Sequence, residues 1–253
     1  MWPWETGIVW TYGLDWKPVP TSRTPLAYTP WLDQLDADSL ASADGPQRVL
    51  RHAAGPPADS ALALAKATPY SIDHRYGAWD SPAATRALLC HFEALRTTPR
   101  YQVLGRVPNR CGSPRLLSSK QTGYGQQVRI PKPRGHDQVV FARIHGTPPS
   151  GLEALRAFFF RAPISYVAFD SKAVYRVVPN VLADGPILDA SAGTDFPKPF
   201  ALAPQARTVA LFKQGGALTT RPRLRFDFYA MRVRPLQPHR GHVRGRDRTS
   251  SRS

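Results

Sequence analysis

Three loop aspartates are the residues of this chain with the clearest potential for catalysis. Asp73, Asp184 and Asp195 all lie outside the periodic segments of the sequence. A glycosidase needs two carboxyl groups about 5–10 Å apart, one as the acid and the other as base or nucleophile. A carbohydrate-active enzyme is therefore one hypothesis. Loop aspartates more often form Asx turns with their own backbone, and this structural role is the favoured interpretation.

The sequence lacks other common catalytic and metal-binding motifs. It contains no Gly-x-Ser-x-Gly elbow, no Walker loop and no His-Glu-x-x-His pattern. The cysteines are far from Cys-x-x-Cys spacing, and Asp36 and Asp38 fall on a predicted helix, where a solvated face explains them. We therefore expect no cofactor and no metal site, and the balance leans against an enzyme.

The tryptophans are the candidates for binding a ligand. All six lie at or before Trp79. Exposed indole rings can stack on sugars or nucleobases through their apolar faces. Trp10 and Trp31 fall on predicted core faces, which leaves Trp2, Trp4 and Trp79 as the possible stacking residues. Packing in the core is the favoured role for most tryptophans in this chain.

The chain is strongly basic, with a formal net charge of +16. Clustered cations bind nucleic acid because they displace the counterions of the phosphates. The arginines are scattered over predicted strands and loops, so nucleic acid is the less favoured partner. Residues 237–253 are rich in arginine and poor in apolar residues, and we predict a disordered basic tail there. No apolar run reaches the roughly 18 residues of a transmembrane segment.

Short periodic segments separated by proline and glycine indicate strands. Candidate strands cover residues 7–12, 87–96, 101–107, 124–130, 138–144, 164–169, 174–178, 207–212 and 223–233. Two short helices are expected. The first is capped by Thr29, with Pro30 at its first position and Trp31 on its apolar stripe, and the second follows a capping box at Ser150.

This pattern predicts a mainly β protein, an antiparallel β-sandwich of jelly-roll type with two short helices. Residues 1–236 would form the β-sandwich domain, with a division into two halves near residues 113–123 as an alternative. The two cysteines, Cys90 and Cys111, are enough for one bridge. The residues alone leave open whether they pair or remain buried thiols.

Several segments carry a resemblance to a known group of proteins. They are Trp4-Glu5-Thr6-Gly7, Asp15-Trp16-Lys17-Pro18-Val19-Pro20, Ala27-Tyr28-Thr29-Pro30-Trp31-Leu32-Asp33, Val103-Leu104-Gly105-Arg106-Val107-Pro108-Asn109-Arg110-Cys111-Gly112 and Asp227-Phe228-Tyr229-Ala230. In these the chain resembles the C-terminal extracytoplasmic region of large actinobacterial polytopic membrane proteins of unknown function.

The resemblance implies that Cys90 and Cys111 face an oxidising space and pair. It also implies an exported sandwich at the extracytoplasmic face of the membrane, joined to an upstream membrane portion. Met1 is followed by no signal-peptide pattern, so an internal start, a fragment boundary or a truncated paralogue is expected there.

The leading functional hypothesis is a non-enzymatic extracytoplasmic β-sandwich module of a membrane protein, structural or binding a glycan of the cell envelope. Its expected partner is that glycan or the membrane portion of a longer protein. The alternatives are a nucleic-acid-binding basic protein and a carbohydrate-active enzyme that uses the loop aspartates.

Overall fold

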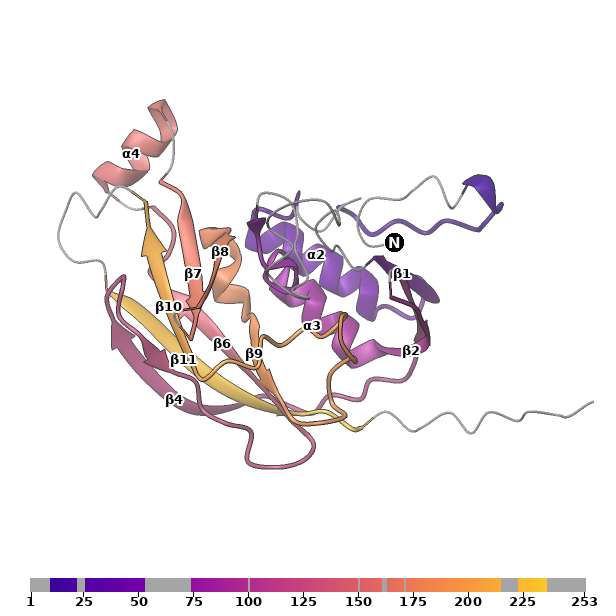
Figure 1. Ribbon diagram of the computed structural model, residues 1–253. Coiled ribbons are helices and arrows are strands. Elements are labelled where there is room, and N and C mark those ends of the chain that lie inside the picture. Colours follow the sequence, from indigo (N-terminus) through magenta and orange to yellow (C-terminus); the bar gives the residue numbers. More distant parts are fainter. Residues whose placement is uncertain are drawn as a thin grey trace, which may run out of the picture.

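The computed structural model describes residues 10–21, 26–52, 74–99, 101–149, 151–160, 163–170, 172–214 and 223–235 (Figure 1). This described part is mainly β, with its strands in three antiparallel sheets and only short helices between them. The mainly β, antiparallel fold class is thereby confirmed. The predicted tail at 237–253 lies outside the described residues.

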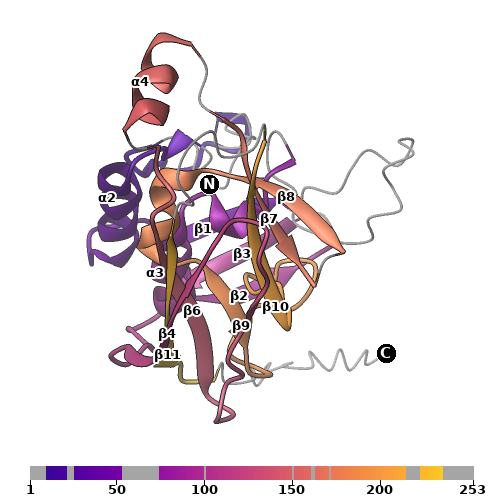
Figure 2. The same ribbon diagram turned by 90° about the vertical axis from the view of Figure 1, so that its left-hand side faces the viewer.

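Two four-stranded sheets face each other and form the sandwich (Figures 1 and 2). One has the order β5 (Val128–Arg129), β10 (Thr208–Lys213), β7 (Ser165–Phe169) and β8 (Ala173–Val177). The other has the order β4 (Arg115–Thr122), β11 (Leu224–Arg232), β6 (Gln138–His145) and β9 (Ile187–Ala190). Their facing side chains belong to one hydrophobic core.

A third, three-stranded sheet lies beside the sandwich. Its order is β1 (Arg48–His52), β3 (Tyr101–Arg106) and β2 (Phe92–Thr97). The helices α2 (Pro30–Ala41) and α3 (Pro82–His91) pack against each other on the same side of the molecule (Figure 1). The short 3₁₀-helices η4 (Gly77–Trp79) and η5 (Pro179–Asp184) contact α3.

Strand β11 follows the sequence pattern closely. Leu224, Phe226 and Phe228 alternate along it and have no exposed surface. β4 pairs with one edge and β6 with the other, so the strand is central in its sheet. A period of two with large apolar residues predicts such a strand because successive side chains point to opposite faces.

Helix α2 begins as the sequence predicts, but its buried face is different. The hydroxyl of Thr29 accepts the N–H of Leu32, and Pro30 occupies the first turn. Trp31, expected on the apolar stripe, is 69% exposed. The inward face instead contains Asp33 and Asp36, whose carboxylates accept backbone N–H groups from other segments. These hydrogen bonds offset the cost of burying two acids.

Two predicted strands are partly helical where the structure describes them. Residues 87–91 belong to helix α3, and β2 begins only at Phe92. Of the predicted strand 7–12, Trp10 and Thr11 are helical, and Trp10 is 71% exposed rather than buried. The short apolar run that contains Leu88 and Cys90 also fits a helix, because so few residues do not distinguish the period of a strand from that of a helix.

Strands β1, β4 and β9 are absent from the prediction, and the predicted strand 124–130 is reduced to β5. Strand β4 contains Ser118, Ser119 and Lys120 and is largely exposed, so it shows no apolar alternation. It is a strand because β11 pairs with it along one side. This pairing joins segments far apart in the sequence, so local residue patterns do not reveal it.

Candidate ligand-binding groove

A groove of about 630 Å³ separates the N-terminal segment from the three-stranded sheet. Residues 14–17 form one wall, and residues 45–50 with Val103 form the other. We call it the aromatic groove because the ring of Trp16 lines it. Small-molecule sites have volumes of roughly 300–1,000 Å³ and mostly apolar walls with a few polar groups, and this groove has that size and character.

Hydrogen bonds fix the position of both walls of the groove. Lys17 Nζ donates to the carbonyl of Asp44 at 2.5 Å, which fixes the end of the N-terminal wall. Four residues later, the backbone N–H of Thr21 donates to Asp36 Oδ1 of α2 at 2.8 Å. On the opposite wall, Arg106 donates through Nε and Nη2 to the carbonyl of Pro46, at 3.2 and 3.0 Å. The walls are therefore anchored to α2 and β3.

Aromatic rings cluster at the N-terminal wall. Trp10 and Trp16 pack edge to face, with their ring centroids 5.8 Å apart and an interplanar angle of 81°. Trp10 is 71% exposed and Tyr12 73% exposed. Lys17 and Arg48 supply polar groups at the rim. Apolar ring faces beside hydrogen-bonding side chains suit a sugar, which has an apolar C–H face and a periphery of hydroxyl groups.

The proposed stacking tryptophans are not the ones in the groove. Trp79 is only 1% exposed, donates through Nε1 to the carbonyl of Ile187 at 2.9 Å and packs edge to face on Phe169. It is a core residue and offers no face to a ligand. Trp2 and Trp4 lie outside the described residues. The usable signal was Gly13, directly after the supposed strand 7–12, because glycine commonly marks a turn; here Gly13 has φ +57° and its N–H donates to the carbonyl of Trp10.

Asp195, one of the three candidate carboxylates, organises its own loop. Its oxygens accept the backbone N–H groups of Phe196, Leu202 and Ala203 at 2.7–3.0 Å. Burial raises its pKa, while these hydrogen bonds and the charge of Arg51 act in the opposite direction. The carboxylate thus ties together the two ends of the loop formed by residues 195–203.

Asp184 lies in a different place, at the end of η5 beside Asp33 of α2. Its Oδ2 is buried and accepts no hydrogen bond. Burial raises the pKa of Asp33 to about 7, and it also raises the pKa of Asp184. Two adjoining carboxyl groups can hydrogen-bond only if they share a proton.

The guanidinium of Arg86 donates to the backbone carbonyls of Asp184 and Gly185. Asp33 has no exposed surface and Asp184 is half-buried, so Asp33 does not reach solvent in this conformation. Asp73 lies outside the described residues. The described residues include no group of three or more metal-ligating side chains.

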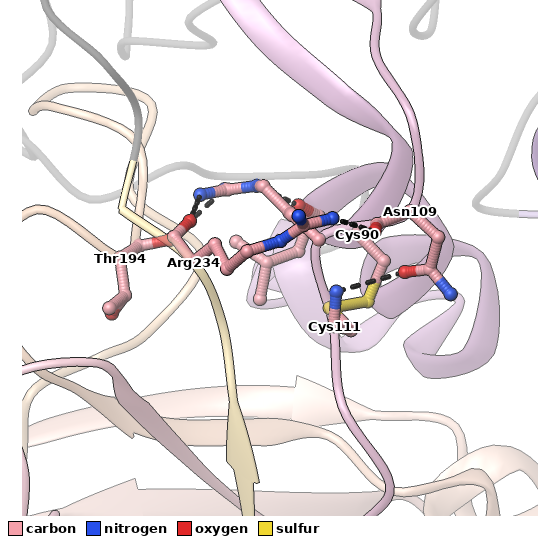
Figure 3. Close-up of a disulfide and its surroundings, with 7 residues drawn as sticks. Cys90, Asn109, Cys111, Thr194 and Arg234 are labelled. Carbon is pink, nitrogen blue, oxygen red and sulfur yellow. Dashed lines mark hydrogen bonds between the residues drawn. A yellow bond between two sulfur atoms is a disulfide. The ribbon is translucent and has the colours of Figure 1, made fainter.

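Cys90 and Cys111 form a disulfide, with their Cα atoms 5.2 Å apart (Figure 3). Asn109 Oδ1 accepts the N–H of Cys111 at 2.9 Å. Arg110, between these residues, donates to the carbonyls of Leu89, Thr194 and Arg234. Disulfides persist in oxidising compartments, so this bond indicates an extracytoplasmic domain. No helix in the described part of the chain has the length and apolar character required to cross a bilayer.

A second groove, of about 690 Å³, is basic. Arg129, Lys132, Arg134 and Arg207 line it, together with Asp189. Burial raises the pKa of Asp189, and Lys132 opposes that shift. No described carboxylate forms an ion pair with the three arginines. We call this cavity the basic groove.

No protein-family model, no curated protein and no solved structure matches this chain. The resemblance to actinobacterial membrane proteins therefore stays a prediction, and the function has to be inferred from the grooves themselves.

Proposed function

We propose that this protein is a non-enzymatic, extracytoplasmic β-sandwich module that binds a cell-envelope glycan in the aromatic groove. The observation that supports it is the ring of Trp16, which lines a mostly apolar groove with polar rim groups and packs edge to face on the exposed ring of Trp10. The disulfide supports the location. Attachment to the extracytoplasmic face through an upstream membrane portion is part of the same proposal.

Binding on the groove would use stacking and hydrogen bonds together. The exposed ring of Trp10 and the half-buried ring of Trp16 provide apolar faces for the C–H side of a pyranose or furanose. Asp15 and Arg48 are placed to hydrogen-bond hydroxyl groups at the rim. The groove needs no cofactor for this role.

The test is binding of the full chain to an array of bacterial cell-envelope oligosaccharides, followed by titration of the strongest hit. Trp10→Ala should weaken the affinity about tenfold, which corresponds to about 1.4 kcal/mol. Trp16→Ala should have at least this effect. Trp31→Ala is the matched control, because Trp31 is equally exposed but lies on α2, outside the groove. An array without hits, or a Trp10→Ala variant that binds like wild type, would reject the proposal.

The basic groove favours a second candidate function, binding of nucleic acid. Much of the arginine content is structural, since Arg51, Arg86 and Arg110 have their guanidinium groups engaged inside the fold. The cations of the basic groove are different, because they surround one cavity. Titration with a single-stranded oligonucleotide should then show affinity that falls steeply with salt and drops in Arg134→Ala. Absence of both effects would remove this alternative.

A further inference from the structure

Helix α4 (Leu152–Phe159) projects from one end of the sandwich (Figures 1 and 2). Four large apolar side chains in its middle and at its C-terminal end lie in solvent. Leu155 is 56% exposed, Phe158 82%, Phe159 66% and Phe160 83%. A contiguous apolar cluster of this kind on a protein surface marks a site of contact with another molecule or with a membrane. We call Leu155, Phe158, Phe159 and Phe160 the phenylalanine tip.

The phenylalanine tip is exposed on several sides. Helical spacing places Leu155, Phe158 and Phe159 on one face, and the rings of Phe158 and Phe159 pack edge to face at 5.1 Å. Phe160 follows the last turn of the helix. A rigid protein surface covers one face of a short helix, whereas the fluid boundary between lipid headgroups and acyl chains can surround a tip. Aromatic side chains are enriched at that boundary.

Basic residues lie at the end of the sandwich from which the chain leaves toward α4. The last residue of β6, His145, is opposite Arg225 in the register of β11. The next residue, Gly146, has φ +82°, and a side chain there would clash with the carbonyl of Arg223, so the turn toward α4 passes directly beside Arg223. Arg223 and Arg225 are both exposed, and Arg225 forms an ion pair with Asp227, with Nε 3.0 Å from Oδ2.

The other sheet adds a cation at the same end. Lys213, the last residue of β10, is opposite Ser165, where the chain enters β7 after α4. An apolar tip with cations at its base has the charge complementarity of an anionic membrane surface, to which each Lys or Arg nearby adds attraction.

We propose that α4 inserts the phenylalanine tip into the headgroup region of an anionic lipid bilayer, with Arg223 and Lys213 contacting the headgroups. The tip and the aromatic groove are on different elements, so this inference does not rest on glycan binding. It gives the module a second attachment to the membrane, through lipid rather than through the polypeptide.

The experiment is co-sedimentation of the full chain with two kinds of vesicle, pure phosphatidylcholine and a 3:1 mixture of phosphatidylcholine with phosphatidylglycerol. Wild type should bind the mixed vesicles at least tenfold more tightly than the neutral ones. The triple variant F158S/F159S/F160S should lose at least tenfold in affinity for the mixed vesicles. It retains the basic residues 237–253, so the difference reports on the tip and not on general charge.

Leu116→Ser is the matched control, because Leu116 is a 50% exposed apolar residue on β4. It should bind vesicles like wild type. Both variants should keep the thermal midpoint of wild type, since the altered side chains are in solvent.

Three outcomes would overturn the proposal. They are absence of vesicle binding by wild type, equal binding by the triple variant, and a wild-type dimer in sedimentation velocity that the triple variant abolishes. The last result would mean that a second copy of the chain covers the tip.

Discussion

The carboxylate of Asp33 caps helix α3 by accepting the backbone N–H of Ala84 at 3.0 Å, although Asp33 belongs to helix α2. The same carboxylate accepts the N–H of Ala83 at 2.8 Å. Ser81, at the N-cap position of α3, makes no side-chain capping bond. The first turn of α3 is therefore satisfied from a distant part of the chain, which fixes the two helices against each other.

Replacement of Asp33 by alanine should destabilise the protein. It leaves two buried N–H groups at the start of α3 without partners, at a cost of about 1–3 kcal/mol in the free energy of unfolding. Asp38→Ala, on the exposed face of the same helix, should change stability by no more than about 0.5 kcal/mol. Urea denaturation of both variants measures this, and equal midpoints for Asp33→Ala and wild type would contradict the capping role.

Stability should depend on pH through Asp33 and Asp184. Burial raises the pKa of Asp33 from 3.8 to about 7, and it raises that of Asp184. Between about pH 4 and 7 the folded state therefore binds more protons than the unfolded state. The free energy of unfolding should be highest at the acid side of this window and fall as pH rises, by at most about 1.4 kcal/mol per pH unit for one group.

The variant Asp184→Asn tests whether the pair Asp33 and Asp184, rather than the other buried acids, causes the pH dependence of stability. The negative charge of Asp184 helps to raise the pKa of Asp33. Without it, the loss of stability with rising pH should still begin near pH 4 but end at a lower pH, because the loss stops once the pH passes the folded-state pKa of Asp33. Urea midpoints measured from pH 4.5 to 7.5 give the profile, with Asp38→Asn as the control that should leave it unchanged. Superimposable profiles for Asp184→Asn and wild type would mean that the two carboxyl groups are not coupled.

Removal of the disulfide should cost about 3 kcal/mol, because the bond between Cys90 and Cys111 closes a loop with a sequence separation of 21. Thermal denaturation with and without dithiothreitol should show this loss. The variant C90S/C111S should have the lowered midpoint and be insensitive to the reductant. If reduction leaves the wild-type midpoint in place, the bond does not restrain the unfolded chain under these conditions.

Replacement by phenylalanine should affect the free energy of unfolding very differently at two tryptophans. Trp79→Phe removes ring volume from the core and leaves the carbonyl of Ile187 without its donor, so a loss of about 1–3 kcal/mol is expected. Trp31→Phe changes a ring that is 69% exposed, and its effect should stay within about 0.5 kcal/mol. Chemical denaturation compares the two, and a similar loss in both would contradict this division between core and surface.

Local signals in the sequence predicted the structure correctly where a residue acts on its immediate neighbours. Thr29 and Pro30 set the start of α2, and the alternation of Phe226 and Phe228 set the central strand β11. The antiparallel, mainly β class followed from many such short segments. Pairing of Cys90 with Cys111 was an implication of the resemblance, and the structure contains that bond.

The candidate site was less accessible, because it depends on contacts between segments distant in sequence. The sequence placed Trp10 on a core face and left Trp79 as a possible stacking residue, whereas Trp10 is exposed and Trp79 is buried. No local sequence pattern indicates that Lys17 donates to the carbonyl of Asp44, the hydrogen bond that fixes the N-terminal wall of the aromatic groove.

The sequence by itself determined the fold class and the start of α2, since backbone propensities and a period of two act over a few residues. Tertiary structure decided which polar residues are buried and which aromatic residues are exposed. Asp33 is inside because α3 offers it two N–H groups, and Phe158 is outside because no described element covers α4. Whether a side chain is buried depends on which segments pack against it, and these segments are often distant in the sequence.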